Sequence, residues 1–208
     1  SWRAARDFTV EVAGPACVVT APWHIRPRFC ALLNPANREL AGTQRPYFPR
    51  GGPLPPPPPP GLQASSSGWG GLDAGPNMLY PMQVVDGLTH MHAGTELRAA
   101  LAAMPADADG ERCAIGAAVL SEPFRLRERF DLLIHTPPPF WPDKASDGWR
   151  QQLASCYTSS ILALVEGARG DGPVAVASPL VGAGAAGAPA HAAAEIAADA
   201  LASLAQRE

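Results

Sequence analysis

Lysine is nearly absent from this sequence, and long apolar runs are missing as well. Lys144 is the one lysine among 16 basic residues, the others are arginines, and the net charge is −3. This balance argues against a general nucleic-acid binder, which needs a basic surface to neutralise phosphates. No apolar run approaches the roughly 18 residues of a membrane-spanning helix. The sequence therefore predicts neither a membrane span nor strong nucleic-acid binding.

Cysteine is also scarce, and its spacing does not match that of a metal site. The four cysteines are far apart and form no C-x-x-C pair, whereas structural zinc sites use close pairs. They fall in or beside apolar runs, where a free cysteine behaves as a small hydrophobic residue. His90 and His92 on one helix would point to different faces. We therefore predict no metal site. The cysteines are Cys17, Cys30, Cys113 and Cys156.

Proline and glycine, by contrast, are abundant and divide the chain. From residue 43 to 83 the sequence is rich in Pro, Gly and Ser, with six consecutive prolines. Such a composition buries no core. We predict an N-terminal part over 1–42, an exposed insertion over 43–83, and the remainder of the same domain over 84–208. Four aromatic residues of the insertion could anchor a partner, so a docking segment stays open as the alternative. They are Tyr47, Phe48, Trp69 and Tyr80.

Apolar patterns on both sides of the insertion predict alternating strands and helices. The run around "FCALLNPAN" indicates a buried parallel strand that delivers Asn34 and Asn37 to a site. Alternating strands and helices favour an α/β three-layer fold. The other strands are expected at 8–12, 16–20, 113–120, 130–138 and 174–181, and helices at 86–104, 149–165 and 190–204.

The stretch "GAGAAG" at Gly182–Gly187 poses a choice between two nucleotide-binding loops. A Rossmann fingerprint belongs in the first βαβ unit and needs an acidic residue about 20 positions later on a further strand. Here the motif follows the last expected strand and precedes a single helix, which excludes that fold. Glycines before a helix N-terminus still suit a phosphate. A tight turn in which Ala and Gly are simply common remains the alternative.

Four separated segments, taken in order, resemble the macrodomain family of ADP-ribose-binding modules, closest to its MacroD-type hydrolases. They are "LLNPANREL", "VVDGLTHMHAGTEL", "CAIGAAVLSEPFRLRERFDLLIHTPPPFW", and "LASCYTSSILALVEGA" with "VAVASPLVGAGAAGAP". The resemblance implies a mixed sheet between helices, with the ligand at the carboxyl ends of the parallel strands.

The resemblance also implies site residues. Asn34 and Asn37 would face the distal ribose of ADP-ribose, and the Asp86 carboxylate would orient a water for hydrolysis. Asp86 as a helix N-cap is the alternative, and His135 is expected to be a hydrogen-bonded core residue. No cofactor is implied, ADP-ribose being the possible ligand. The diphosphate would be wrapped by Gly182, Ala183, Gly184, Ala185, Ala186 and Gly187.

Several departures from the family pattern predict a decayed ligand site. Pro81–Val84 replaces the family's glycines before Val-Asp-Gly, and Pro81 has no N–H to offer. The stretch 20–25 lacks the carboxylate that bonds adenine. Ala186 stands where an aromatic is usual, and the chain stops at Glu208, before the family's last strand and helix. Each lost polar partner weakens binding by about 1–3 kcal/mol.

Three functional hypotheses follow. The favoured one is a non-catalytic structural or accessory subunit of a larger assembly, contacted through the 43–83 insertion or through the sheet edge left by the truncated C-terminal end. The others are an ADP-ribose-binding module and an ADP-ribosyl hydrolase that uses Asp86. Because the chain begins at Ser1 rather than Met, we expect an organellar protein, mitochondrial or chloroplast, after removal of a transit peptide.

Overall fold

The computed structural model describes most of the chain outside the insertion. The described residues are 9–10, 17–20, 29–43, 84–142, 144–167 and 174–206. Most of the expected strand at 8–12 lies outside them, as does the insertion beyond Thr43. Residues 21–25 and 81–83, which carry two of the departures from the family pattern, also lie outside the described residues.

The described strands form one mixed sheet of four, in the order β2-β3-β1-β4. The central strand β1 runs parallel to β3 and β4, and β2 pairs antiparallel with β3. A central parallel strand is covered on both faces, so β1 reads as a continuous apolar run. The prediction of a buried parallel strand at this place is confirmed. The bounds are β1 Phe29–Pro35, β2 Val119–Ser121, β3 Leu132–Thr136 and β4 Val174–Ala177.

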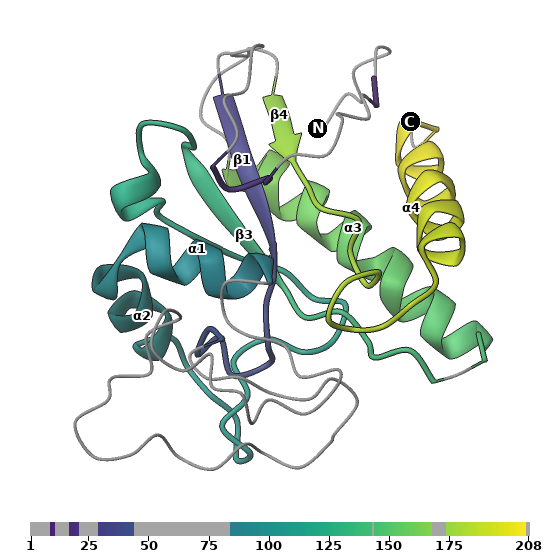
Figure 1. The fold of residues 1–208 in the computed structure, drawn as a ribbon, viewed down its shortest axis with the longest axis horizontal. Helices are drawn as coiled ribbons and strands as arrows, with labels where there is room; N and C mark the ends of the chain where they lie inside the picture. Colours follow the sequence, from purple (N-terminus) through teal and green to yellow (C-terminus); the bar gives the residue numbers. More distant parts are fainter. Residues whose placement is uncertain are drawn as a thin grey trace, which may run out of the picture.

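Helices cover both faces of this sheet. Figure 1 shows α1 and α2 on one side of the strands and α3 and α4 on the other. The predicted three-layer α/β arrangement is therefore confirmed. The bounds are α1 Val85–Ala93, α2 Thr95–Ala102, α3 Asp147–Gly167 and α4 Ala190–Ala205, with a 3-10 helix at Phe124–Leu126.

Alternate side chains of β1 feed two separate cores. Leu32 packs in a cluster that includes Leu97 of α2, whereas Leu33 packs in a cluster that includes Leu153 of α3. This is the period of two that a strand imposes, because successive side chains point to opposite faces. Asn34 is two residues beyond Leu32, so it lies on the same face of the sheet, the face that α1 and α2 cover.

The single helix expected over 86–104 is wrong, because the structure has two helices there. Gly94 separates α1 from α2 with φ +93° and ψ −175°, a conformation that L side chains rarely adopt. A Cβ on Gly94 would also lie 2.6 Å from a carboxylate oxygen of Glu96. The expected helices over 149–165 and 190–204 are confirmed within α3 and α4.

Two expected strands are also corrected. Residues 17–20 form a turn, closed by the Thr20 N–H donating to the Cys17 carbonyl, rather than a strand. The adjacent Val18 and Val19 are both buried in one core, which a strand would not allow. The strand expected over 113–120 begins only at Val119, because a turn with Gly116 at φ +80° precedes it.

The strand expected over 174–181 ends at Ala177. Pro179 follows, which has no N–H for a sheet ladder, and the chain then turns into the glycine loop. Among the described strands β4 lies at an edge of the sheet and pairs with β1. The docking of a partner chain along β4 stays a prediction.

Candidate functional site

The predicted site residues gather at one end of the sheet. β1, β3 and β4 run parallel, so their carboxyl ends meet at the same edge, which is where open α/β sheets bind ligands. Asn34 lies near the end of β1, His135 near the end of β3, and the glycine loop follows β4. The first turn of α1 brings Asp86 to Asn34.

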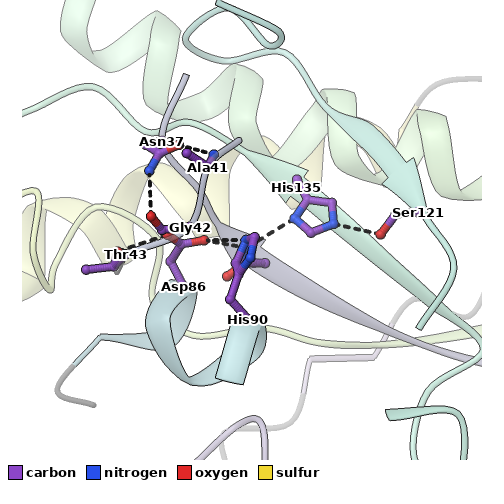
Figure 2. A network of polar contacts seen from close by, with 9 residues as sticks. Asn37, Ala41, Gly42, Thr43, Asp86, His90, Ser121 and His135 are labelled. Atoms are coloured by element: carbon purple, nitrogen blue, oxygen red, sulfur yellow. Dashed lines mark hydrogen bonds and ion pairs between the residues drawn. The ribbon is translucent and has the colours of Figure 1, made fainter. Parts of the chain in front are cut away.

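Asp86 is held by hydrogen bonds to both of its carboxylate oxygens. The amide Nδ2 of Asn34 donates to Oδ1 over 2.9 Å, and the hydroxyl of Thr43 donates to Oδ2 over 2.9 Å. Figure 2 shows Thr43 and Asp86 meeting across this contact. Asp86 is 5% exposed, so these bonds offset the desolvation of its carboxylate. The carboxylate is therefore fixed between β1 and the segment that follows it.

The interpretation of Asp86 as a helix N-cap is wrong. The N-cap residue of α1 is Val84, and Asp86 lies inside the first turn. Its negative charge there is still favourable, because the N-terminal end of a helix carries a partial positive charge. The side chain itself, however, bonds to β1 and to Thr43.

His135 is fully buried and hydrogen-bonded through both ring nitrogens, as Figure 2 shows for its contact with Ser121. Its Nδ1 lies 3.1 Å from Nδ2 of Asn34, and its Nε2 lies 2.8 Å from Oγ of Ser121. Burial, with a smaller contribution from His90, lowers the pKa of His135 to about 3. The imidazole is therefore neutral near pH 7, and the expectation of a hydrogen-bonded core residue is confirmed.

His90 stands one helical turn after Asp86 and is also buried. Its Nε2 lies 3.6 Å from Oδ1 of Asp86, which is longer than a hydrogen bond. The pKa of His90 is lowered from its ordinary 6.5. Burial is the largest cause, the charge of Asp86 partly opposes it, and the charge of Arg98 adds to it. His92, by contrast, is exposed, so the two histidines do point to different faces, as predicted.

Asn37 directs its side chain at the turn that follows it. Its Oδ1 accepts from the Ala41 N–H over 2.9 Å, and its Nδ2 donates to the Gly42 carbonyl over 3.4 Å. Figure 2 shows Asn37 beside these two residues. The side chain thereby shapes the segment that carries Thr43. A direct contact of Asn37 with a ligand stays a prediction.

The glycine loop is closed by its own backbone. Gly187 donates to the carbonyl of Gly184 over 2.9 Å, and Ala188 donates to that of Gly182 over 2.9 Å. Trp141 donates to the carbonyl of Ala186 from the segment after β3, over 2.8 Å. Within the described part of the chain, the N–H groups of residues 184, 185 and 186 have no hydrogen-bond acceptor. Three consecutive amides are thus left for an outside acceptor.

The start of the loop is anchored to α3. The Val181 N–H donates to the hydroxyl of Tyr157 over 2.9 Å, and both residues are buried. Burial raises the pKa of Tyr157 to about 12, so the hydroxyl stays protonated. Gly182 has φ +86°, and a Cβ there would lie 3.0 Å from Leu153. The loop therefore has to follow α3 closely, and glycine permits this.

The structure adds three residues to this site that the sequence analysis did not name as site residues: Thr43, Ser121 and Tyr157. Ser121 could not be found from pattern alone, because its contact with His135 depends on the register of β2 against β3. A Ser178–His135 pair is not formed, since the Ser178 hydroxyl donates to the neighbouring carbonyl of Pro179.

Metal-ligating side chains do not cluster in the part of the chain that the structure describes. No group of three or more His, Cys, Asp or Glu side chains there could hold a metal ion. Burial raises the pKa of Cys113 and of Cys156 to about 11, so both thiols are protonated near pH 7. As for membranes, no described helix is both long and apolar enough to cross a bilayer.

Comparisons with known proteins agree on one family. A model of the Macro domain matches residues 77–197. A macro domain-containing protein of Xanthomonas campestris is 36% identical over 77 residues, and one of Xanthomonas axonopodis matches to the same extent. That match covers 37% of this chain and spans 41% of the length of either relative.

Solved structures agree on the fold. The Oceanobacillus iheyensis macrodomain with ADP superposes with a TM-score of 0.59 at 22% identity, covering 93% of this chain and 75% of that one. A point mutant of the same macrodomain with ADPR gives the same score and identity and covers 77% of that chain. At this identity the likeness shows the fold alone.

Proposed function

The chain belongs to the Macro domain family, and from this premise we propose that it is a module that binds ADP-ribose. The glycine loop would hold the diphosphate, and the end of β1 would hold the distal ribose. Macrodomains of the same fold have been solved with ADP and with ADPR.

The observation that carries the proposal is the set of amides in the loop. The N–H groups of residues 184–186 have no acceptor in the described part of the chain, while the bonds around them keep the loop closed. Consecutive backbone N–H groups before a helix bind anions, because they point at one spot and the helix end is positive. α4 begins at Ala190, three residues after Gly187. A diphosphate, which carries negative charge on several oxygens, fits such a loop.

The distal ribose finds an acceptor in Asn34. Its Oδ1 is buried and has no hydrogen-bond partner among the described residues. An unpaired buried acceptor is costly, and a sugar hydroxyl would supply the missing donor once the groups that cover Oδ1 make way for it. β4 lies beside β1 in the sheet, with its last residue Ala177 opposite Leu32, so the loop after β4 leaves the sheet at the edge where Asn34 lies.

Binding is favoured over hydrolysis by the state of Asp86. A carboxylate that orients a water has to be reachable by that water, and Asp86 is only 5% exposed. Here Oδ1 accepts from Asn34 and Oδ2 accepts from Thr43. We therefore propose a binding module first. The hydrolase that uses Asp86 is the second candidate, and it requires a water to reach the buried carboxylate.

Calorimetric titration of the chain with ADP-ribose tests the proposal. The variant Gly184→Val tests whether the glycine loop is the part that binds. No described atom lies within 4 Å of a Cβ on Gly184, and its φ is not positive. Valine would therefore fit the protein and fill the space in front of the amides. Gly148, exposed at the start of α3, has the same open surroundings, so Gly148→Val is the matched control.

We expect micromolar binding by the unaltered chain. Gly184→Val should weaken it more than ten-fold, because hydrogen bonds to a charged group are worth about 1.5–3 kcal/mol each. Gly148→Val should leave the affinity unchanged. The absence of heat at millimolar ADP-ribose, from a sample shown to be folded, would contradict the proposal. It would leave the decayed site and the subunit of a larger assembly, and native partners would then be isolated.

Two further predictions accompany this proposal. The contact with an assembly through the 43–83 insertion or the β4 edge stays a prediction, because the insertion beyond Thr43 lies outside the described residues. The organellar address also stays a prediction. Fractionating cells that express the native chain checks the second of these.

A further inference from the structure

We propose that Ser121 and His135 are positioning residues. Together they hold the side-chain amide of Asn34 in one orientation, with Oδ1 left as the acceptor for the ligand. The inference rests on the proposed function, because its consequence is the affinity for ADP-ribose. It adds two residues that act on the ligand only through another side chain.

The sheet itself aligns these three residues. Asn34 and His135 are partners in the parallel register of β1 and β3, so their side chains share one face. Val119 is opposite His135 in the antiparallel pair of β2 and β3. Ser121 is two residues further along β2, on the same face and diagonal to His135. A row of polar side chains thus runs from the edge strand β2 to the central strand β1.

The hydrogen bonds along this row have one consistent direction. Asn34 Nδ2 has two hydrogens, and it lies 2.9 Å from Oδ1 of Asp86 and 3.1 Å from Nδ1 of His135. The carboxylate is an acceptor, and Nδ1 has to accept as well. The proton of His135 is then on Nε2 and is donated to Oγ of Ser121 at 2.8 Å. The Ser121 hydroxyl in turn donates to the carbonyl of Glu122 at 3.3 Å.

The opposite orientation of Asn34 is unfavourable. It would place the amide oxygen against a carboxylate oxygen of Asp86 and against an unprotonated ring nitrogen of His135. Three acceptors would then meet in a buried place with no donor between them, which leaves each one unsatisfied. The other tautomer of His135 would remove part of this conflict, because its Nδ1–H could donate to the amide oxygen. Because the Ser121 hydroxyl gives its own hydrogen to the carbonyl of Glu122, it accepts from Nε2 and favours the tautomer that keeps Oδ1 of Asn34 free for the ligand.

His135 can serve in this way because it is neutral. It is fully buried, and burial lowers its pKa to about 3. A protonated ring would carry donors on both nitrogens and would oppose the amide of Asn34. The neutral ring is a fixed donor on one side and a fixed acceptor on the other.

Nitrogen-15 NMR of the full chain with labelled histidine reads the tautomer directly, and calorimetry reads the affinity. In the unaltered chain we expect His135 as the Nε2–H tautomer. Ser121→Ala should populate both tautomers and weaken ADP-ribose binding about five-fold, the value of one hydrogen bond. Ser121→Thr keeps the hydroxyl and should restore both readouts. Ser160→Ala is the matched control, because Ser160 is a buried serine on α3 whose hydroxyl has no hydrogen-bond partner among the described residues, and it should change neither.

Each outcome has a defined meaning. A His135 ring with its proton on Nδ1 in the unaltered chain overturns the inference, and this measurement needs no variant. A loss of affinity in Ser121→Ala without a change of tautomer also overturns it, because Ser121 would then not act through His135. An unaltered chain that binds no ADP-ribose contradicts the proposed function. The tautomer would in that case still decide the arrangement of Asn34, His135 and Ser121.

Discussion

Replacing Gly42 by alanine tests the packing behind Asp86. Gly42 directly precedes Thr43, whose hydroxyl donates to Asp86. The φ of Gly42 is +73°. A Cβ built on Gly42 lies 2.5–2.7 Å from three ring atoms of His90. His90 is 1% exposed, so its ring has no open space to move into. Either the turn or the helix α1 has to shift.

The expected loss of stability has two parts. A residue other than glycine in the left-handed region is destabilised by about 1–2 kcal/mol. Inserting a methyl group into a filled space adds about 1–3 kcal/mol. Gly42→Ala should therefore lower the free energy of unfolding by about 2–5 kcal/mol. A loss of this size is a large share of the stability of a typical domain.

Gly110→Ala separates the two parts. Gly110 has φ +83°, and no described atom lies within 4 Å of a Cβ there. This variant should lose only the backbone part, about 1–2 kcal/mol. Urea denaturation of the full chain, followed by circular dichroism, measures both variants. In a His90→Ala background the ring is absent. Gly42→Ala should then lower the free energy of unfolding by no more than Gly110→Ala does.

Equal losses for Gly42→Ala and Gly110→Ala would refute the reasoning. So would an undiminished loss for Gly42→Ala in the His90→Ala background. Either result would mean that the His90 ring does not lie against Gly42. The bond between Thr43 and Asp86 depends on the same turn, and it would then have to be reconsidered.

Two other variants make smaller tests of the same site. The pKa of His135 in the folded chain is about 3, below its ordinary 6.5, so between these values the unfolded chain binds the proton more readily. The free energy of unfolding therefore decreases as pH falls from about 6.5 towards 3, by up to about 1.4 kcal/mol per pH unit. Urea denaturation at pH 7 and at pH 5 should show a smaller decrease for His135→Gln than for the unaltered chain. Tyr157→Phe leaves the buried Val181 N–H without its acceptor; it should lower stability by about 1–3 kcal/mol and weaken ADP-ribose binding, measured by denaturation and calorimetry.

Periodicity in the sequence predicts the elements that fill the core. The helices α3 and α4 and the strands β1 and β3 appear where the apolar pattern puts them, because each buries a face with a regular spacing. The break between α1 and α2 was missed, since an isolated glycine inside a helical pattern is usually tolerated. The helix is interrupted at Gly94, which has an extended ψ and lies against the side chains of Glu96 and Arg125. Neither can be seen in a sequence window.

The site is less predictable than the core, because its contacts join distant parts of the chain. The family resemblance singled out Asn34 and Asp86, which lie 52 positions apart and do meet. Thr43 lies outside the four matching segments, and Ser121 lies inside one of them but was not recognised as a site residue. Thr43 reaches Asp86 on α1 because of the turn before it, and the side chain of Asn37 holds that turn. The contact of Ser121 depends on a strand of three residues whose start was misplaced.

The same carboxylate supports both candidate functions, and its partners decide between them. Asp86 Oδ1 orients the amide of Asn34, a task that serves ligand binding and needs no water. Oδ2 accepts from the Thr43 hydroxyl, and the burial of the side chain limits the access of a water to either oxygen. In the described arrangement the contacts and the burial of Asp86 favour the proposed binding module over the proposed hydrolase.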